Sequence, residues 1–141
     1  MPLPDDSRSL KGGPVAQRII AEVRRDAEAA RAEGFPPRLV SITVGDTAAV
    51  DVYVRNQRAK AALAGIDFEE RRLPHDITAA ELEAAIHGMN ADPRITGIII
   101  QRPVPPHIPI KAIQAAVHPL KDVEGMHPAS IGNIVYNQLD L

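Results

Sequence analysis

The sequence feature that most constrains the fold is the apolar run from Thr96 to Gln101, which reads TGIIIQ. A strand that is apolar at consecutive positions, rather than at alternate ones, is typical of a parallel sheet covered by helices on both faces. The run stops at Arg102 to Pro106, where successive prolines can extend neither a strand nor a helix. We therefore expect an α/β protein with this strand in the middle of its sheet.

Two further segments have the composition of strands. Arg38 to Val44 is rich in β-branched residues, and Ile66 to Leu73 mixes charged and apolar residues as a half-exposed edge strand does. Apolar residues at helical spacing predict four connecting helices, at residues 14–33, 47–64, 78–90 and 108–117. The order α-β-α-β-α-β-α with right-handed crossovers gives a three-layer α/β sandwich around a small parallel sheet. Residues after 118 are polar and aperiodic, which is typical of a functional loop, and predict no further full element.

Length and composition are those of one intracellular domain. A chain of 141 residues can bury a core without disulfides, and this one has no cysteine to form them. Residues 1–13 are expected to form a flexible arm and residues 14–141 a single domain. A net charge of -2 and an aromatic content of 3% argue against nucleic acid as a partner. No apolar stretch suits a signal peptide or a membrane span, so we expect a cytoplasmic protein without a membrane partner.

The segment from Val44 to Arg58 is the candidate ligand site. It joins the end of a strand to the start of a helix, and ligands of open α/β sheets bind beside such turns. Val50, Tyr53 and Gln57 are spaced i, i+3 and i+7, which places them on one face of the helix. Gln101 ends the apolar strand at the same edge of the sheet, so we expect it to converge with Val44–Gly45, and the loop of residues 121–127 is free to reach them.

Four segments of the sequence carry recognisable patterns, namely Gly97–Pro105, Lys121–Pro128, Val44–Gly45 and Tyr53–Val54. They resemble signatures of the bifunctional methylenetetrahydrofolate dehydrogenase and methenyltetrahydrofolate cyclohydrolase family. The corresponding family patterns are G-I-L-V-Q-L-P-L-P, K-D-V-D-G-F-H-P, V-G-x-x-P-A-S and Y-V-x-x-K. The likeness covers most of the chain and implies the amino-terminal catalytic, folate-binding domain of that family.

The resemblance also implies roles for single residues. Tyr53 stands where the family's tyrosine packs on the folate rings, Gln101 where its glutamine meets the one-carbon unit, and Glu124 where its acid holds the pterin. An aromatic face suits a fused heteroaromatic ring, and a carboxylate accepts two parallel hydrogen bonds from a guanidine-like edge. The candidate catalytic residues are Gln57, Gln101 and Asp122, with His127 as an alternative proton donor. The candidate substrate-binding residues are Tyr53, Val50, Gln101, Pro103 and Glu124.

The chain departs from the family pattern at the helix face that carries the chemistry. Gln57 replaces the catalytic lysine, Val50 replaces a serine and Ala48 a proline. An amide has no titratable proton near neutral pH, and losing general acid–base help costs roughly 10²- to 10⁴-fold in rate. Cyclohydrolase activity is therefore expected to be weak or absent. Glu124 is one methylene longer than the family's aspartate, which changes the pose or affinity of the pterin.

The family draws its nicotinamide cofactor from a carboxyl-terminal Rossmann domain, and none of the nine glycines here forms G-x-G-x-x-G. We therefore expect no dinucleotide-binding domain, no NADP and no hydride transfer by this chain alone. The sequence is then a shortened one, one completed by a partner chain, or a stand-alone descendant, and the coincident changes at the active face favour the last. The five histidines show no metal-binding spacing. The resemblance also implies a homodimer.

Two classes of function follow. In the first, the chain is an enzyme that transfers or hydrolyses the one-carbon unit of a tetrahydrofolate derivative. In the second, it is a non-catalytic folate-sensing or structural module. Each site residue also has a structural alternative: Tyr53 as a packing residue, Gln57 as solvated surface, Gln101 as a cap. Arg102, at a position that is apolar in the family, is either a charge for an anionic second substrate, such as a one-carbon acceptor, or an ordinary surface residue.

Overall fold

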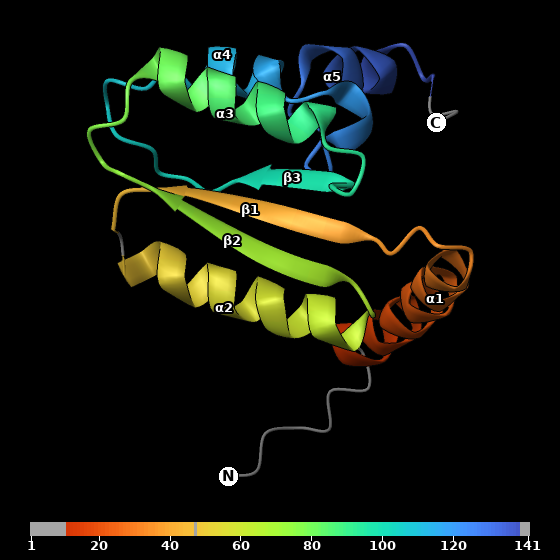
Figure 1. Cartoon of the computed structure of the whole chain (residues 1–141). Coiled ribbons are helices and arrows are strands. Elements are labelled where there is room, and N and C mark those ends of the chain that lie inside the picture. The colour runs from red at the N-terminus through yellow and green to blue at the C-terminus, as the bar shows by residue number, and fades with distance from the viewer. Residues whose placement is uncertain (1–10, 47, 139–141) are drawn as a thin grey trace, which may run out of the picture.

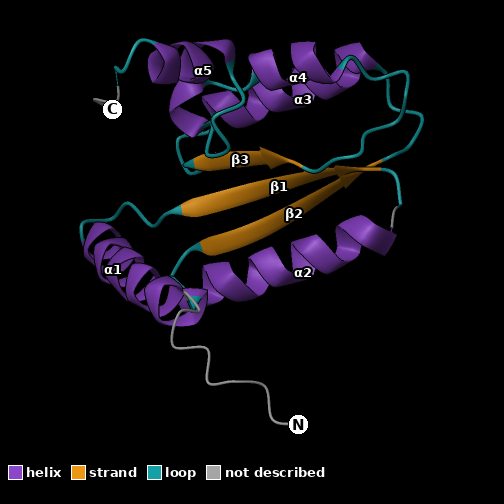
Figure 2. Cartoon of the chain, turned by 180° about the vertical axis from the view of Figure 1, so that it is seen from behind, coloured by secondary structure: helices purple, strands orange, loops and turns teal. Residues whose placement is uncertain are grey.

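The computed structural model describes residues 11–46 and 48–138, which form a sheet between two helical layers (Figure 1). Helix α2 covers one face of the sheet, with α1 against the end of α2 beside the amino ends of the strands, and α3, α4 and α5 lie over the other face, as the view from behind also shows (Figure 2). The predicted three-layer α/β sandwich is confirmed. The elements are α1 Gly12–Ala32, β1 Arg38–Val44, α2 Ala48–Leu63, β2 Asp67–Leu73, α3 Ala79–Ala91, β3 Gly97–Ile100, α4 Ile110–Ala116, the 3-10 turn η1 Pro119–Lys121 and α5 Pro128–Val135.

All strand pairs in the sheet are parallel, and the strand order is β2-β1-β3. The prediction that the apolar strand β3 lies in the middle is wrong, because β1 pairs with both of the others. The chain after α4 covers the outer edge of β3: Asp122 makes a bridge to Ile98, and Val123 packs on Gly97. A Cβ atom on Gly97 would lie 2.7 Å from Val123 Cγ1, so only glycine permits this approach. The edge strand is therefore buried by a loop in place of a fourth strand.

The two faces of the sheet differ in polarity because side chains alternate along each strand. The face toward α3 and α4 holds the main apolar core, made of Val40, Ile42, Val44, Leu82, Ile86, Met89, Ile95, Ile98, Ile100, Ile108, Ile113 and Val117. The face toward α2 carries Ser41, Thr43 and Gln101, which are buried and polar. Buried polar groups require partners, so this second face is where specific hydrogen bonds are expected.

Helix α1 begins earlier than the sequence predicts. Of the expected arm, residues 1–10 lie outside the described residues, while Gly12 and Gly13 already belong to the first turn of α1. Pro14, expected at the first helical position, is the third. It is tolerated there because the first backbone N–H groups of a helix have no intrahelical partner for proline to remove. The predicted helix start at Pro14 is therefore two residues too late, and the division into an arm and a domain stays a prediction.

Helix α5 was not predicted, and the expectation of no full element after the polar loop is wrong. His127 caps the helix, with its Nδ1 accepting a hydrogen bond from the Ala129 N–H at 3.0 Å, and Pro128 stands at the first helical position. Four apolar side chains on this short segment stay exposed, namely Ile131, Ile134, Val135 and Tyr136. The start of this helix is therefore determined by its capping residues, and not by packing of an apolar helix face on the core.

Other local predictions are confirmed. Thr78 and Glu81 form the expected capping box of α3, with Thr78 Oγ1 accepting from the Glu81 N–H at 3.2 Å and Glu81 Oε2 accepting from the Thr78 N–H at 2.9 Å. Strand β2 is a half-exposed edge strand, as its charged sequence indicates. Among the described residues, no helix combines the length and the apolar character needed to cross a membrane.

Candidate functional site

The carboxyl ends of the three parallel strands meet at one rim of the sheet. Gly45 follows β1 with a φ of +76°, and its N–H donates to the Leu73 carbonyl at the end of β2, at 2.8 Å. A Cβ atom there would lie 3.2 Å from the His75 ring, so glycine both permits the turn and lets the two loops meet. The Gln101 N–H donates to the Ile42 carbonyl of β1 at 2.8 Å. The convergence predicted from the sequence is present.

Gln101 and Gln57, two of the candidate catalytic residues, contact each other. The Gln101 Nε2 donates to Gln57 Oε1 at 2.6 Å and to the Ser41 hydroxyl at 2.8 Å. Gln101 is only 8% exposed, so this network fixes its amide from the sheet on one side and from α2 on the other. Of the remaining groups, Gln101 Oε1 can accept from a ligand donor, and Gln57 Nε2 can donate to a ligand acceptor. Neither amide can take up or release a proton near neutral pH.

Ser41 is a site residue that the sequence analysis missed. Its side chain is fully buried, and its hydroxyl accepts one of the two hydrogen bonds from Gln101. The available signal was the alternation in RLVSITV, where Ser41 and Thr43 interrupt an otherwise apolar strand on the same face. Two polar residues at positions i and i+2 of a central strand indicate a polar partner on the helix that covers it.

The other two residues of the α2 face lie at different depths. Tyr53 is 66% exposed, so its ring is accessible to a planar ligand. Val50 is 2% exposed and packs beneath α2. A direct contact between Val50 and a substrate stays a prediction, and its burial favours a packing role. The i, i+3, i+7 spacing aligned these residues correctly along the helix but could not tell which of them the sheet covers.

Asp122 holds together the loop that follows η1. Its carboxylate accepts from the His127 N–H at 2.8 Å and from the Met126 N–H at 3.2 Å. Burial acts to raise the pKa of Asp122, but the hydrogen bonds from His127, the Ser130 hydroxyl and Met126 together hold this pKa below its ordinary value. A carboxylate that is ionised and already accepts several bonds suits a structural role better than proton transfer. The proposed catalytic role of Asp122 stays a prediction.

Glu124 reaches the end of β3 from the same loop. Its Oε2 accepts from the Ile100 N–H at 3.3 Å, next to Gln101 in the chain. The loop therefore approaches the predicted site as expected. One carboxylate oxygen is used internally, so only the other is fully available to a ligand. The paired hydrogen bonds expected between Glu124 and a pterin would require the bond to Ile100 to be given up or shared.

Pro103 and Arg102 stand exposed just beyond Gln101, and the peptide bond between them is cis. His127, the alternative proton donor, is occupied as the cap of α5 through its Nδ1. His75 and His107 also lie at this rim, with ring centroids 6.0 Å apart. No group of three or more potential metal ligands occurs within residues 11–46 and 48–138.

Comparison with known proteins decides the family. Residues 10–124 match the catalytic domain of tetrahydrofolate dehydrogenase/cyclohydrolase. The chain belongs to this family. The recognition drawn from the four sequence segments is therefore confirmed, and the match falls on the catalytic domain, as expected.

Relatives of the family cover the chain almost completely. The bifunctional protein FolD 2 of Mesorhizobium japonicum is 84% identical over 141 residues, which is 100% of this chain and 46% of that protein. FolD 3 of Roseobacter denitrificans is 52% identical, over 95% of this chain and 45% of that protein. The crystal structure of FolD from Campylobacter jejuni superimposes with a TM-score of 0.85 at 31% identity, covering 87% of this chain and 44% of that one. The chain spans about half the length of the curated relatives it matches.

These relatives change one interpretation. A divergent stand-alone descendant should differ broadly from the bifunctional proteins of the tetrahydrofolate dehydrogenase/cyclohydrolase family. Identity of 84% across the whole chain does not support that interpretation, and no finding specifically favours the non-catalytic sensing module. Gln57, Val50 and Glu124 are thus departures from a general family pattern within a chain that is otherwise close to bifunctional relatives.

The turn from β1 into α2 does not fit the pyrophosphate of a dinucleotide. One related structure, from Trypanosoma brucei, is titled as a complex with an NADP cofactor and inhibitor, and it matches with a TM-score of 0.82 at 28% identity over 92% of this chain and 44% of that one. Here the turn from β1 into α2 holds a single glycine, Gly45, whose neighbour is the His75 ring. A pyrophosphate needs several glycines for close backbone approach, so this turn is not built for one.

Salt bridges fix the start of α2, which carries Tyr53 and Gln57. The Arg72 guanidinium of β2 contacts Asp51 in the first turn of α2, Asp46 in the preceding turn and Glu70 beside it on β2. The hydrogen bonds with Asp51 and then Asp46 raise the pKa of Arg72 above its ordinary value. Exposed ion pairs contribute little energy individually, but one guanidinium joining two elements restricts how α2 can turn.

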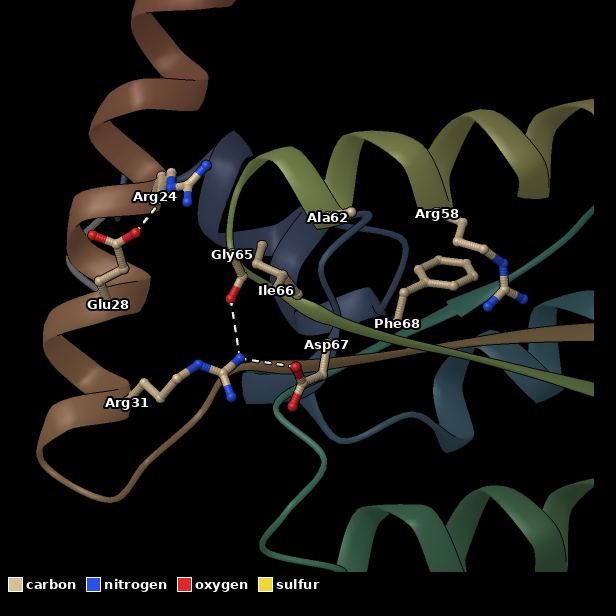
Figure 3. Close-up of a pocket in the computed structure, with 9 residues that line it drawn as sticks. All are labelled: Arg24, Glu28, Arg31, Arg58, Ala62, Gly65, Ile66, Asp67 and Phe68. Atoms are coloured by element: carbon tan, nitrogen blue, oxygen red, sulfur yellow. Dashed lines mark hydrogen bonds and ion pairs between the residues drawn. The ribbon is translucent and has the colours of Figure 1, made fainter.

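A separate hollow of about 530 Å³ lies where α1, the end of α2 and the start of β2 meet (Figure 3). Its arginines are engaged: Arg31 donates to Asp67 Oδ1 at 2.8 Å and to the Gly65 carbonyl at 3.2 Å, and the Arg58 guanidinium lies 5.0 Å from the Phe68 ring centre. The hollow is at the amino ends of the strands, opposite the candidate site. It is best explained as the joint between the two helices of this layer.

Proposed function

We propose that this chain binds a tetrahydrofolate derivative at the rim formed by the carboxyl ends of β1 and β3, as the catalytic domain of a one-carbon enzyme. The observation that carries the proposal is the hydrogen bond between Gln101 Nε2 and Gln57 Oε1, at 2.6 Å. It leaves the Gln101 oxygen and the Gln57 amide N–H groups for a ligand, and the buried Ser41 hydroxyl fixes the Gln101 amide. Membership of the tetrahydrofolate dehydrogenase/cyclohydrolase family supports the class of ligand.

Each residue then has a physical task. The exposed ring of Tyr53 offers a face for the pterin or the adjoining aromatic ring. Glu124 offers a carboxylate oxygen to the pterin N–H groups. The amides of Gln101 and Gln57 orient the one-carbon bridge by hydrogen bonds, without exchanging protons with it.

Hydrolysis of a methenyl bridge by this site is slow in this proposal. Water attack releases a proton, and the pair Gln57–Gln101 offers no group that can take it. The missing general base lowers the rate by about 10²- to 10⁴-fold compared with a site that has one. Hydrolysis or transfer of the one-carbon unit is nevertheless the reaction class that the ligand and the family favour.

Further parts of the proposal concern the surroundings. The absence of cysteine fits a reducing cytoplasm. Arg102 stands exposed one residue beyond Gln101 and offers a positive charge to an anionic acceptor of the one-carbon unit. A homodimer is proposed from the family resemblance.

Calorimetric titration with reduced folates tests the binding proposal. The chain is expected to bind, and Tyr53→Ala to weaken binding by about 1 to 3 kcal/mol, the usual contribution of an aromatic side chain stacked on a base. Tyr136→Ala is the matched control, because Tyr136 is also exposed but follows α5. Absence of binding at millimolar folate, or equal losses in the two variants, would overturn the proposed ligand or its position.

A further inference from the structure

Lys121, the last residue of η1, hydrogen-bonds to the carboxyl end of α3. Lys121 Nζ donates to the backbone carbonyls of Met89, Asn90 and Asp92 at 3.0, 2.7 and 2.7 Å. The last carbonyls of a helix have no intrahelical partner, and a cation there also interacts favourably with the helix dipole. All three N–H bonds of the ammonium group are used, so Lys121 has no donor left for a ligand in this arrangement.

Asn90 ties the same segment from its other end. Its Nδ2 donates to the Ala116 carbonyl, the last residue of α4, at 2.7 Å, and its Oδ1 accepts from the His118 N–H at 2.9 Å. His118 is the capping residue of η1. The chain from the end of α4 to Lys121 is therefore held at three points by the last turn of α3.

Two residues of the candidate site, Asp122 and Glu124, stand one and three residues beyond this attachment. Asp122 makes the bridge to Ile98 on the outer edge of β3, and Glu124 accepts from the Ile100 N–H. Three residues span at most about 10 Å, so the position of Lys121 strongly limits where the Glu124 carboxylate can lie. In both views the chain between α4 and α5 descends from the helical layer to β3 (Figures 1 and 2).

We propose that Lys121 and Asn90 are positioning residues of the site. They attach the chain before Glu124 to the end of α3 and thereby set the position of the Glu124 carboxylate relative to Gln101. The ligand affected is the folate of the proposed function, on which this part of the inference rests. The structural part, that the attachment holds Glu124 against Ile100, is independent of any ligand.

The decisive variant is Lys121→Met, which keeps an unbranched side chain one atom shorter and removes the charge. We expect faster hydrogen exchange at the Ile100 amide and about a ten-fold loss of reduced-folate affinity, equivalent to losing one well-placed hydrogen bond. Lys121→Arg should keep much of the Ile100 amide protection and of the folate affinity, because a guanidinium can still donate to several carbonyls. Lys111→Met, on the exposed side of α4, is the matched control and should change neither.

A double-mutant cycle separates positioning from general stability. If Lys121 acts through Glu124, then Lys121→Met combined with Glu124→Gln should weaken folate binding no more than Glu124→Gln alone. Additive losses would overturn the proposal, as would an Ile100 amide that exchanges at the parent rate in Lys121→Met. Should Lys121→Met fail to fold, Asn90→Ser loosens the same segment more mildly and is judged by the same two measurements. If the parent chain binds no folate, the proposed function fails, and exchange at Ile100 still decides whether Lys121 positions Glu124.

Discussion

Replacing Gln57 by lysine is expected to raise the rate of methenyltetrahydrofolate hydrolysis. In the parent chain Gln57 Oε1 accepts from Gln101 Nε2, and a lysine ammonium would instead place a donor against that donor. The network can adapt, because the Gln101 amide can rotate by half a turn to present its oxygen to the ammonium. The Ser41 hydroxyl, which now accepts from Gln101, can donate to the same oxygen.

The expected decrease in the activation free energy of hydrolysis exceeds the expected loss of folding stability. General acid–base help contributes roughly 10²- to 10⁴-fold, or about 3 to 5 kcal/mol of activation free energy. The Gln57–Gln101 hydrogen bond contributes about 0.5 to 1.5 kcal/mol to folding, and rotation of the amide replaces part of it. Gln57 is half-buried, so partial burial should lower the pKa of an introduced lysine toward the working pH, which favours proton exchange.

The assay follows the loss of methenyltetrahydrofolate absorbance with each purified chain, together with calorimetric folate affinity. Gln57→Met is the matched control, since it has similar length and lacks both the acceptor and the base. It should bind folate without hydrolysing it faster. If Gln57→Lys binds folate as tightly as the parent chain but gives no faster hydrolysis, then the missing lysine does not explain slow turnover. The proposed effect of Gln57 on the hydrolysis rate would then be wrong.

Three other changes test the site and its support. Ser41→Ala should lower the free energy of unfolding by about 1 to 2 kcal/mol in urea titration, because the buried Gln101 N–H loses a partner; an unchanged midpoint would mean that water replaces the hydroxyl. Glu124→Ala should cost about 1 to 3 kcal/mol of folate affinity through unpaired pterin donors; unchanged affinity would remove Glu124 from the site. Asp122 has a lowered pKa in the folded chain, so its contribution to stability is complete above its ordinary value of 3.8 and is lost as the pH falls through the folded value. Asp122→Asn should therefore weaken the dependence of the urea midpoint on pH in this acid range, and an identical pH profile would contradict the assigned role.

The sequence was most informative about the site where local rules apply. Gln101 could be placed at the rim because a polar amide closes an apolar parallel strand, and Gln57 could be aligned with Tyr53 by helical spacing. The hydrogen bond between Gln57 and Gln101 could not be foreseen, since it joins residues 44 positions apart in the sequence. The motif Lys121–Pro128 drew attention to a loop, but only the folded chain shows that Asp122 holds the loop and that Lys121 holds the end of α3.

The sequence by itself determined the order of the three strands and of helices α1 to α4, because periodicity, capping and β-branched composition act over a few residues. It also determined that the sheet is parallel, since a helix follows each strand. Tertiary structure alone decided that β1 and not β3 is central, because an apolar strand can be buried by a loop on its edge as well as by a neighbouring strand. It likewise decided that Val50 is covered while Tyr53 is exposed, because the docking of α2 on the sheet sets the depth of each side chain on a shared helix face.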